Sequence, residues 1–179
     1  DYGVLLRGGL IYSAAGKIAV YGKAPASCTS GWHRAIGMGW NGDGGQSDNI
    51  VSTSSASDAI LLRGDASSCN SAGSVAAMAI QDFYSAGTNV AAPNGGGVTL
   101  YGVSGNASFQ SGTFGNNNQE SDVLELNYVN VLANSGAINL TAVRTNAATY
   151  HGVRFNPRGT GSNNSVGATT AAISTGIAA

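Results

Sequence analysis

The sequence predicts an all-β fold in which short strands stack as a solenoid, and three features of the chain lead to that prediction. The first is an internal repeat, because residues 3–24 (GVLLRGGLIYSAAGKIAVYGKA) align without a gap with residues 123–144 (VLELNYVNVLANSGAINLTAVR), at a constant offset. The second is that apolar residues alternate with polar or small ones in both copies, which is the period of a β-strand. The third is that Gly, Asn and Ser fill the joints, as turns require.

A strand signature, a small residue followed by two apolar residues with one residue between them, recurs along the chain. Its six copies start near positions 3, 35, 59, 97, 123 and 152. The spacing is irregular, about 30 residues, which lies in the range of stacked repeat architectures. Like strands that cannot bury a face alone are stabilised when they stack about 4.8 Å apart in parallel sheets, and crossovers between parallel strands are right-handed. We therefore predict a right-handed parallel β-helix of about six coils with loop insertions. Residues 1–179 would form one domain, either complete or a segment of a larger exoprotein.

The alternation also divides the strand residues into an inward and an outward set. Residues expected to face the core are Val4, Leu6, Ile11, Ile18, Val20, Ile60, Leu62, Val75, Val98, Leu100, Leu124, Leu126, Val131, Ile138 and Leu140. Residues expected to face water are Arg7, Arg63, Glu125, Asn127 and Asn139.

Four variable segments, residues 25–33, 41–49, 81–95 and 111–121, are expected to be loops that project from the coils. Two interpretations of the aromatic residues in or beside them stay open, a platform for a ligand or packing over the edge of a coil. These candidate ligand-binding residues are Trp32, Trp40, Phe83, Tyr84 and Phe114. We expect His33 to be an exposed loop histidine.

The two cysteines, Cys28 and Cys69, are too few for a disulfide scaffold and lack the spacing of a metal site. Both lie in turn-like sequence, where the distance between them cannot be inferred. The sequence therefore leaves open whether they form a disulfide or remain thiols. No metal and no cofactor are predicted.

The composition and the acidic residues favour a protein without catalytic activity. Charged residues make up 9% of the chain and the net charge is −1, so there is no basic surface for nucleic acid, and no apolar run is long enough to span a membrane. No Gly-x-Ser-x-Gly motif or phosphate-binding loop is present. Three acidic pairs fit turn chemistry better than glycosidic-bond cleavage: Asp43 with Asp48, Asp58 with Asp65, and Glu120 with Asp122.

The repeated segments at residues 3–24 and 123–142 resemble the passenger repeats of filamentous haemagglutinin-like exoproteins. These are large bacterial adhesins exported by two-partner secretion, and autotransporter passengers are their structural relatives. Residues 59–80 and 152–173 share the resemblance more loosely. The resemblance implies a β-helix located outside the cell, on the bacterial surface.

The sequence therefore predicts an extracellular structural or adhesive protein, either an adhesin segment or a subunit of a self-assembling surface filament. Its expected partners are other copies stacked end to end, neighbouring coils of a longer chain, or a cell-surface glycan or matrix. The alternative is a carbohydrate-binding or carbohydrate-cleaving β-helix of the tailspike or lyase type.

Overall fold

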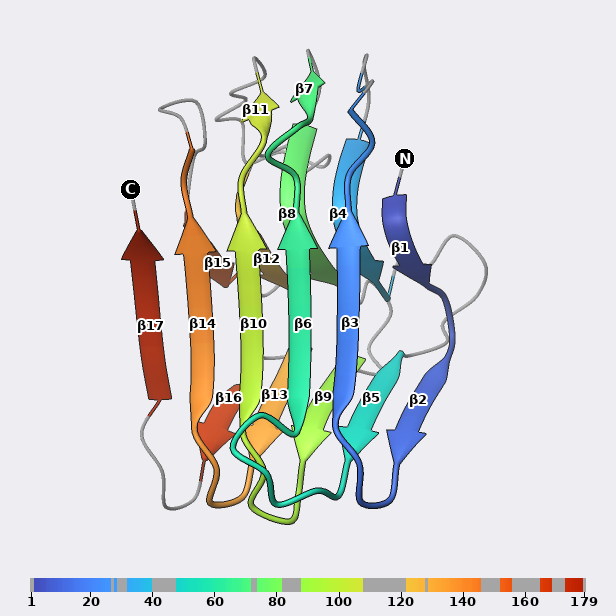
Figure 1. The fold of residues 1–179 in the computed structure, drawn as a ribbon, viewed down its shortest axis with the longest axis vertical. Helices are drawn as coiled ribbons and strands as arrows, with labels where there is room; N and C mark the ends of the chain where they lie inside the picture. Colours follow the sequence, from blue (N-terminus) through green and yellow to red (C-terminus); the bar gives the residue numbers. More distant parts are fainter. Residues whose placement is uncertain are drawn as a thin grey trace, which may run out of the picture.

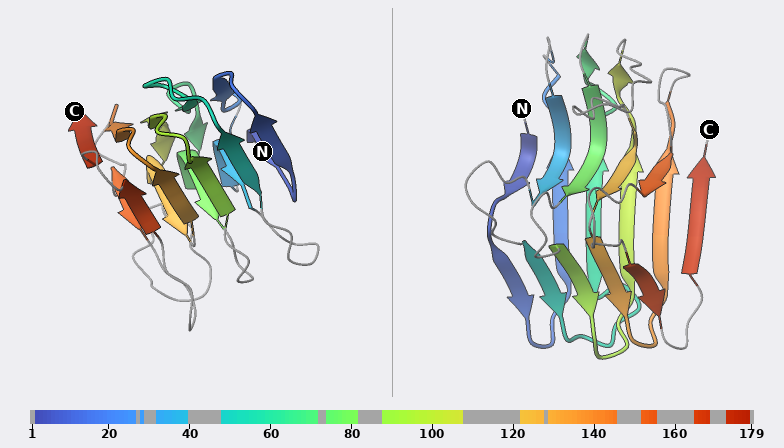
Figure 2. Two further views of the ribbon diagram at one scale, coloured as in Figure 1. Left: turned by 90° about the horizontal axis from the view of Figure 1, so that it is seen from below. Right: turned by 180° about the vertical axis from the view of Figure 1, so that it is seen from behind.

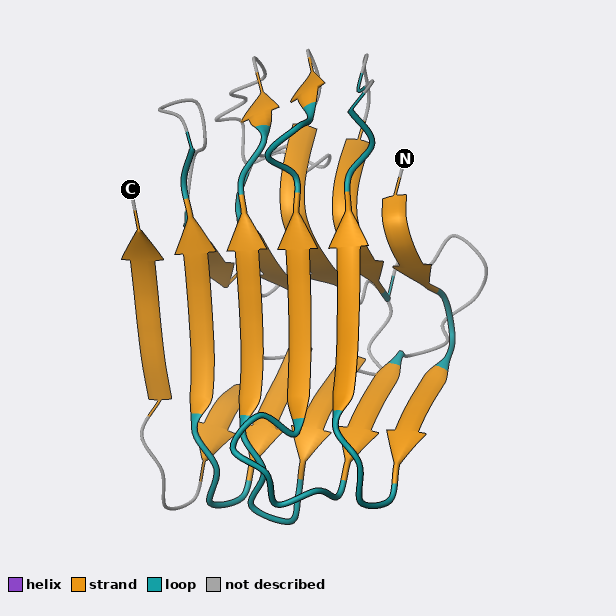
Figure 3. Cartoon of the chain, viewed as in Figure 1, coloured by secondary structure: helices purple, strands orange, loops and turns teal. Residues whose placement is uncertain are grey.

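The computed structural model of the chain describes residues 2–26, 28, 32–39, 48–71, 74–81, 88–107, 122–127, 129–145, 152–155, 165–168 and 173–178. Every regular element within these residues is a β-strand (Figure 3). The predicted all-β fold is therefore confirmed for the described part of the chain. A search of the same residues finds no helix with the length and apolar character needed to cross a membrane.

Three sheets of five strands each make up the body of the structure, and two short strands form a small fourth sheet. The first sheet contains β1 (Tyr2–Leu6), β4 (Trp32–Met38), β8 (Ser74–Gln81), β12 (Leu124–Asn127) and β15 (Val153–Phe155). The second contains β2 (Leu10–Ser13), β5 (Asn49–Ser52), β9 (Thr88–Ala92), β13 (Val129–Ala133) and β16 (Ser165–Ala168). The third contains β3 (Ile18–Lys23), β6 (Ile60–Asp65), β10 (Val98–Val103), β14 (Ile138–Val143) and β17 (Ile173–Ala178), and the small sheet pairs β7 (Asn70–Ser71) with β11 (Asn106–Ala107).

All strand pairs in the three large sheets are parallel, and the chain visits the sheets in the same order each time it goes round. Figure 1 shows the third sheet in front, with the first and second sheets behind its upper and lower parts. The two views of Figure 2 show the strands of each sheet following one another along a common axis. This arrangement of stacked parallel sheets is consistent with the predicted β-helix.

The internal repeat seen in the sequence corresponds to true structural equivalence. On the first sheet, one row of paired residues runs from Val4 through Ile36 and Met78 to Leu124 and Val153. Val4 and Leu124 are the residues that the repeat aligned. The second and third sheets contain equivalent rows, which run from Ile11 to Val131 and from Ile18 to Ile138.

The predicted repeat spacing of about 30 residues fits the first and last steps of the first sheet, where Val4 pairs with Ile36 and Leu124 pairs with Val153. It is too short in the middle of the chain, because two of the predicted strand starts lie on another sheet. Those near positions 59 and 97 lead into β6 and β10 of the third sheet, whereas the other four lead into strands of the first sheet. Ile60, the predicted counterpart of Val4, therefore lies on a different sheet from it.

The true length of a circuit is given by neighbours within one sheet. On the second sheet, Asn49 and Asn89 are hydrogen-bonded neighbours on adjacent strands and are 40 residues apart, and Asn89 and Asn130 are 41 residues apart. On the third sheet, Ile18, Ile60, Val98 and Ile138 are successive partners with similar separations. In this part of the chain, one circuit places a strand in each of the three large sheets before the chain returns to the sheet where it started. The number of residues in such a circuit is larger than the predicted spacing.

The main core lies between the three sheets and is built from the inward set of residues. Of that set, Val4, Leu6, Ile11 and Val20 are partly buried and pack against the core, Val75 belongs to a second, smaller cluster, and the others are buried within the main one. The exceptions to full burial lie on β1, β2 and β3, the first strand of each sheet. The inward predictions are confirmed.

A row of small residues lets the third sheet lie close against the first. Gly22, Gly64 and Gly102 pair with one another on β3, β6 and β10, and Ala142 continues the row. A Cβ atom at Gly64 would overlap the carbonyl oxygen of Ala77 on β8, and one at Gly22 would overlap a backbone carbonyl oxygen of β4. Side chains at these positions would push the two sheets apart.

Candidate functional site

The structure describes only one of the five candidate ligand-binding aromatic residues, which is Trp32. Trp32 begins β4, so its backbone belongs to a strand of the first sheet. Trp40, Phe83, Tyr84 and Phe114 lie outside the described residues. The proposed aromatic platform therefore stays a prediction.

His33 does not lie in an exposed loop, contrary to the prediction. It follows Trp32 on β4, pairs in register with Val75 on β8, and is 1% exposed. The prediction was wrong because the strand begins earlier than the first apolar pair of the segment, so His33 is carried into the interior.

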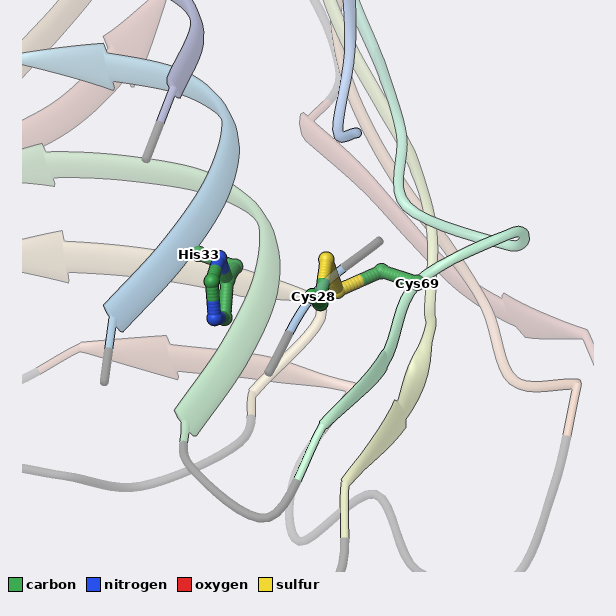
Figure 4. Close-up of side chains that lie close together, drawn as sticks. All are labelled: Cys28, His33 and Cys69. Carbon is green, nitrogen blue, oxygen red and sulfur yellow. A yellow bond between two sulfur atoms is a disulfide. The ribbon is translucent and has the colours of Figure 1, made fainter. Parts of the chain in front are cut away.

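The structure joins Cys28 and Cys69 in a disulfide, with their Cα atoms 5.4 Å apart (Figure 4). Cys28 follows the end of β3 and Cys69 follows the end of β6, which are neighbouring strands of the third sheet. The bond therefore links the segments that follow two adjacent strands at the same end of this sheet. Both cysteines are buried in a small cluster separate from the main core, whose other members are Ala24, Ala35, Ala66 and Val75.

His33 completes a group of three potential metal ligands with the two cysteines. One ligand atom from each of Cys28, His33 and Cys69 lies within 4.8 Å of the other two, and all three residues are buried. Figure 4 shows the imidazole on β4 beside the disulfide. Sequence reasoning missed this group because its members come from three separate segments. The only signal was a histidine shortly after a cysteine.

Glu125 and Asn127 were expected to face water, but they are 0% and 1% exposed. On β12, Glu125 lies between the core residues Leu124 and Leu126, so its side chain points to the opposite face of the first sheet. Alternation correctly predicted the face, but it could not show that this face is covered.

The covered face of the first sheet holds a network of buried charges. The Arg154 guanidinium donates to Glu125 Oε1 at 2.8 Å through Nη2, and its Nε lies 2.5 Å from Asp122 Oδ2. Arg34 Nη2 lies 3.9 Å from Glu125 Oε2, and Asn127 Nδ2 donates to Glu125 Oε1 at 2.9 Å. Two carboxylates and two guanidiniums therefore neutralise one another and connect β4, β12 and β15.

Burial governs the electrostatics of this network. It lowers the pKa of Arg34, and the nearby carboxylate of Glu125 opposes that effect. Burial also raises the pKa of Tyr2, which the charge of Arg34 partly offsets. The arrangement is that of a structural ion-pair network, since each charged group is held by a partner of opposite sign.

The acidic residues of the predicted pairs that the structure describes have structural contacts. Asp48 is buried and accepts hydrogen bonds from the backbone nitrogens of Gly9, at 2.7 Å, and Gly39. Asp58 pairs with Lys17 at 2.6 Å on the surface, which lowers the pKa of Asp58. Asp65 caps a turn by accepting hydrogen bonds from Ser67 N at 2.9 Å and Ser67 Oγ at 2.6 Å. Asp43 and Glu120 lie outside the described residues.

The outer face of the third sheet carries a row of side chains, of which the sequence analysis predicted only Arg63 to face water, and Arg63 is exposed. Tyr21, Arg63 and Tyr101 are consecutive partners on β3, β6 and β10. The Arg63 guanidinium carbon lies 5.1 Å from the centre of the Tyr101 ring, which is cation–π distance. The signal available in the sequence was a large polar or aromatic residue directly after a core residue on each of these strands.

The second sheet presents a different row on its outer face. Asn89 Nδ2 donates to Asn49 Oδ1 at 2.7 Å, and Asn130 Nδ2 donates to Asn89 Oδ1 at 2.9 Å. The side chains therefore form a hydrogen-bonded ladder along the axis of the stack. On the first strand, β2, the position in register with Asn49 is occupied by Leu10, which is 66% exposed.

The first strand of each sheet forms an open edge. β1, β2 and β3 each end the strand order of their sheet, and no other described strand pairs with their outer edges. Exposed apolar side chains gather on these strands, namely Leu5, Leu10, Tyr12 and Tyr21. Core-facing residues of the same strands are only partly buried. This end of the stack therefore combines strand edges that no described strand covers with accessible apolar surface.

Comparisons with known proteins do not identify relatives of the chain. No protein-family model, no curated protein and no solved structure matches it. The resemblance to filamentous haemagglutinin-like repeats therefore stays a prediction.

Proposed function

We propose that this chain is an extracellular structural β-helix that extends a stack of coils end to end, as an adhesin segment or as the subunit of a surface filament. In this proposal the three sheets are the faces of a right-handed helix, the hand that crossovers between parallel strands adopt. In this proposal the coils number about five rather than the predicted six, because each large sheet contains five of the described strands and the middle circuits are about 40 residues long.

The observation that carries the proposal is the open edge formed by β1, β2 and β3. Isolated sheets protect their edges with charged residues, prolines or covering segments, because free edges pair with other chains. The side chains that this edge exposes are instead mainly apolar, with Leu10 and Tyr12 more than half exposed. A further coil stacked on this edge would pair its backbone groups and bury Val4, Ile11 and Val20.

Two other observations support an extracellular location and the association of copies of the chain. The Cys28–Cys69 disulfide is typical of an oxidising compartment, which supports a position outside the cell. The low charge of the chain, 9% charged residues and a net charge of −1, leaves little electrostatic repulsion between copies. Stacking of the last strands of one copy on the first strands of another is open association, which produces fibres.

The test places one charge in the stacked interface and the same charge on an inner strand, away from the interface. Val20 faces the core on β3, in register with the buried Leu62, whereas Leu132 lies on β13, a strand paired on both sides, and is 40% exposed. We expect the wild-type chain to form fibres or end-to-end oligomers in electron microscopy and sedimentation velocity. Val20→Lys should prevent this, because stacking would bury an unpaired ammonium group. Leu132→Lys, the matched control on an inner strand, should still assemble.

Circular dichroism shows whether both variants keep their β-structure, so a folding failure is recognised separately. A wild-type chain that stays monomeric over the whole concentration range would refute self-association. Equal assembly by both variants would refute the position of the interface.

A second candidate function is carbohydrate binding, which the row of Tyr21, Arg63 and Tyr101 favours. Tyr21 is exposed and Tyr101 is partly exposed on the outer face of one sheet, so their rings offer surfaces on which sugar rings can stack, and Arg63 adds hydrogen-bond donors. If this function is correct, Tyr101→Ala should abolish binding in a polysaccharide panel. Tyr12→Ala, an exposed tyrosine on the second sheet, is the control and should bind as the wild type does.

A further inference from the structure

We propose that Cys28, His33 and Cys69 form a zinc site when the disulfide is reduced, so that the same three residues hold either a covalent bond or a metal ion. The proposal is independent of the stacking function.

The ligand chemistry fits zinc. Two cysteine sulfurs and one imidazole nitrogen form a set of soft and borderline donors that Zn²⁺ prefers, with a fourth position left for water. In a tetrahedral site with Zn–S near 2.3 Å and Zn–N near 2.0 Å, ligand atoms lie about 3.5–3.8 Å apart. The three ligand atoms already lie within 4.8 Å of one another. Small side-chain rotations would bring them to these separations once the sulfurs are no longer bonded.

The backbone around the site is held in place without the disulfide. Ala24 N donates to Asp65 O at 2.9 Å, which ties the segment after β3 to the last residue of β6. Cys69 N donates to Ala66 O at 2.8 Å. On β4, the Arg34 guanidinium donates to the carbonyl oxygen of His33 at 3.0 Å. Cys69 and His33 therefore have backbone contacts of their own, and the segment that leads to Cys28 is held at Ala24.

The surroundings favour a neutral group. The cluster around the two cysteines consists of alanine and valine side chains, and all three ligands are buried. One Zn²⁺ with two thiolates and a neutral imidazole carries no net charge, so it can be buried there without an unpaired ion.

The switch between the two states is a balanced redox step. A dithiol reductant transfers two electrons and two protons, breaks the bond between the two sulfurs, and closes its own disulfide. Cys28 and Cys69 are then thiols. Zn²⁺ binds the two sulfurs and the imidazole nitrogen, and two protons are released. The metal thereby replaces the covalent link between the segments after β3 and β6.

The test uses the purified full chain, reduced with a dithiol that is then removed without air. Titration with Co²⁺ reports thiolate ligands through their charge-transfer absorption, and Zn²⁺ should displace the cobalt. We expect one ion per reduced chain and none bound through thiolate in the oxidised chain. Cys28→Ser and Cys69→Ser should each weaken this absorption. His33→Gln should lower the affinity at least about tenfold, since the loss even of an outer partner of a ligand has that effect.

His151→Gln, which changes the other histidine of the chain, is the matched control and should bind as the wild type does. X-ray absorption of the zinc-loaded wild-type chain gives a second readout that needs no variant, and it should show two sulfur ligands and at least one nitrogen. A reduced chain that gives no thiolate absorption overturns the proposal. So does an unchanged affinity in His33→Gln, or a zinc shell without sulfur.

Discussion

Reduction of the Cys28–Cys69 disulfide is expected to lower the free energy of unfolding by about 4 kcal/mol. The bond joins residues 41 positions apart, so it restricts a long loop in the unfolded chain. For a loop of this length the chain-entropy relation gives about 13 cal/mol/K, which corresponds to about 4 kcal/mol at 25 °C. Reduction leaves the same side chains in place, so neither a cavity nor a new hydroxyl group contributes to the difference.

The measurement is urea denaturation of the wild-type chain with and without a dithiol, in the presence of EDTA so that no zinc replaces the bond. A variant with Cys28→Ala and Cys69→Ala together is the control, and the dithiol should leave its midpoint unchanged. The folded chain should keep its β-structure in both states, because the sheets are held by their own backbone pairing. A difference of less than about 1 kcal/mol between the oxidised and reduced wild type would refute the loop-entropy reasoning.

Three further predictions concern other parts of the structure. Glu125→Gln should lower the free energy of unfolding by about 3–5 kcal/mol in urea denaturation, because two buried arginines lose a carboxylate; a change below about 1 kcal/mol would show that the network is not structural. Gly64→Ala should cost about 1–3 kcal/mol by forcing two sheets apart, whereas Gly9→Ala, whose added Cβ would lie 3.8 Å from the nearest atom, should cost less. Hydrogen bonds from Ser67 hold the pKa of Asp65 below its ordinary value, so their contribution to stability is present above about pH 4 and lost as the pH falls through the folded-state pKa. Ser67→Ala should raise the pKa of Asp65 in an NMR titration, and an unchanged value would contradict the assigned cause.

The inward-facing residues could be predicted from the sequence because strand alternation is a local property. Period-two patterns alone assign Val4, Leu124 and Ile138 to the core, and the structure confirms them. The internal repeat also correctly places β1 and β12 in one sheet. Such patterns depend only on neighbours along the chain, so no three-dimensional information is needed.

The length of the middle circuits could not be read correctly because strands of different sheets share the same signature. Gly22 and Gly64 belong to the third sheet, yet their strands have the same alternation as those of the first sheet. Only the pairing between strands shows to which sheet a strand belongs, and this pairing joins residues that are far apart in the sequence. Repeats that pass three similar faces therefore give a shorter apparent period than the true one.

The residues of the candidate site were missed or misplaced because burial depends on what covers a sheet. Glu125 has the alternation of an outward residue and does point outward, but its side chain is fully covered. His33 was expected in a loop because polar and small residues surround Cys28 in the sequence. His33 and Cys69 lie close together because of how β3, β4 and β6 are placed in space. The sequence around either residue does not show this placement.

The three outer faces also differ in a way that bears on assembly. The asparagine ladder of the second sheet connects Asn49, Asn89 and Asn130 but stops at the first strand, where Leu10 takes the corresponding position. A solenoid that ended there as a free edge would be expected to carry lysine or proline on that strand, since such residues prevent pairing with other chains. β2 instead has leucine and tyrosine at its two most exposed positions. Because exposed apolar groups on an unprotected edge favour association, the composition of this strand supports a covered end and therefore end-to-end stacking.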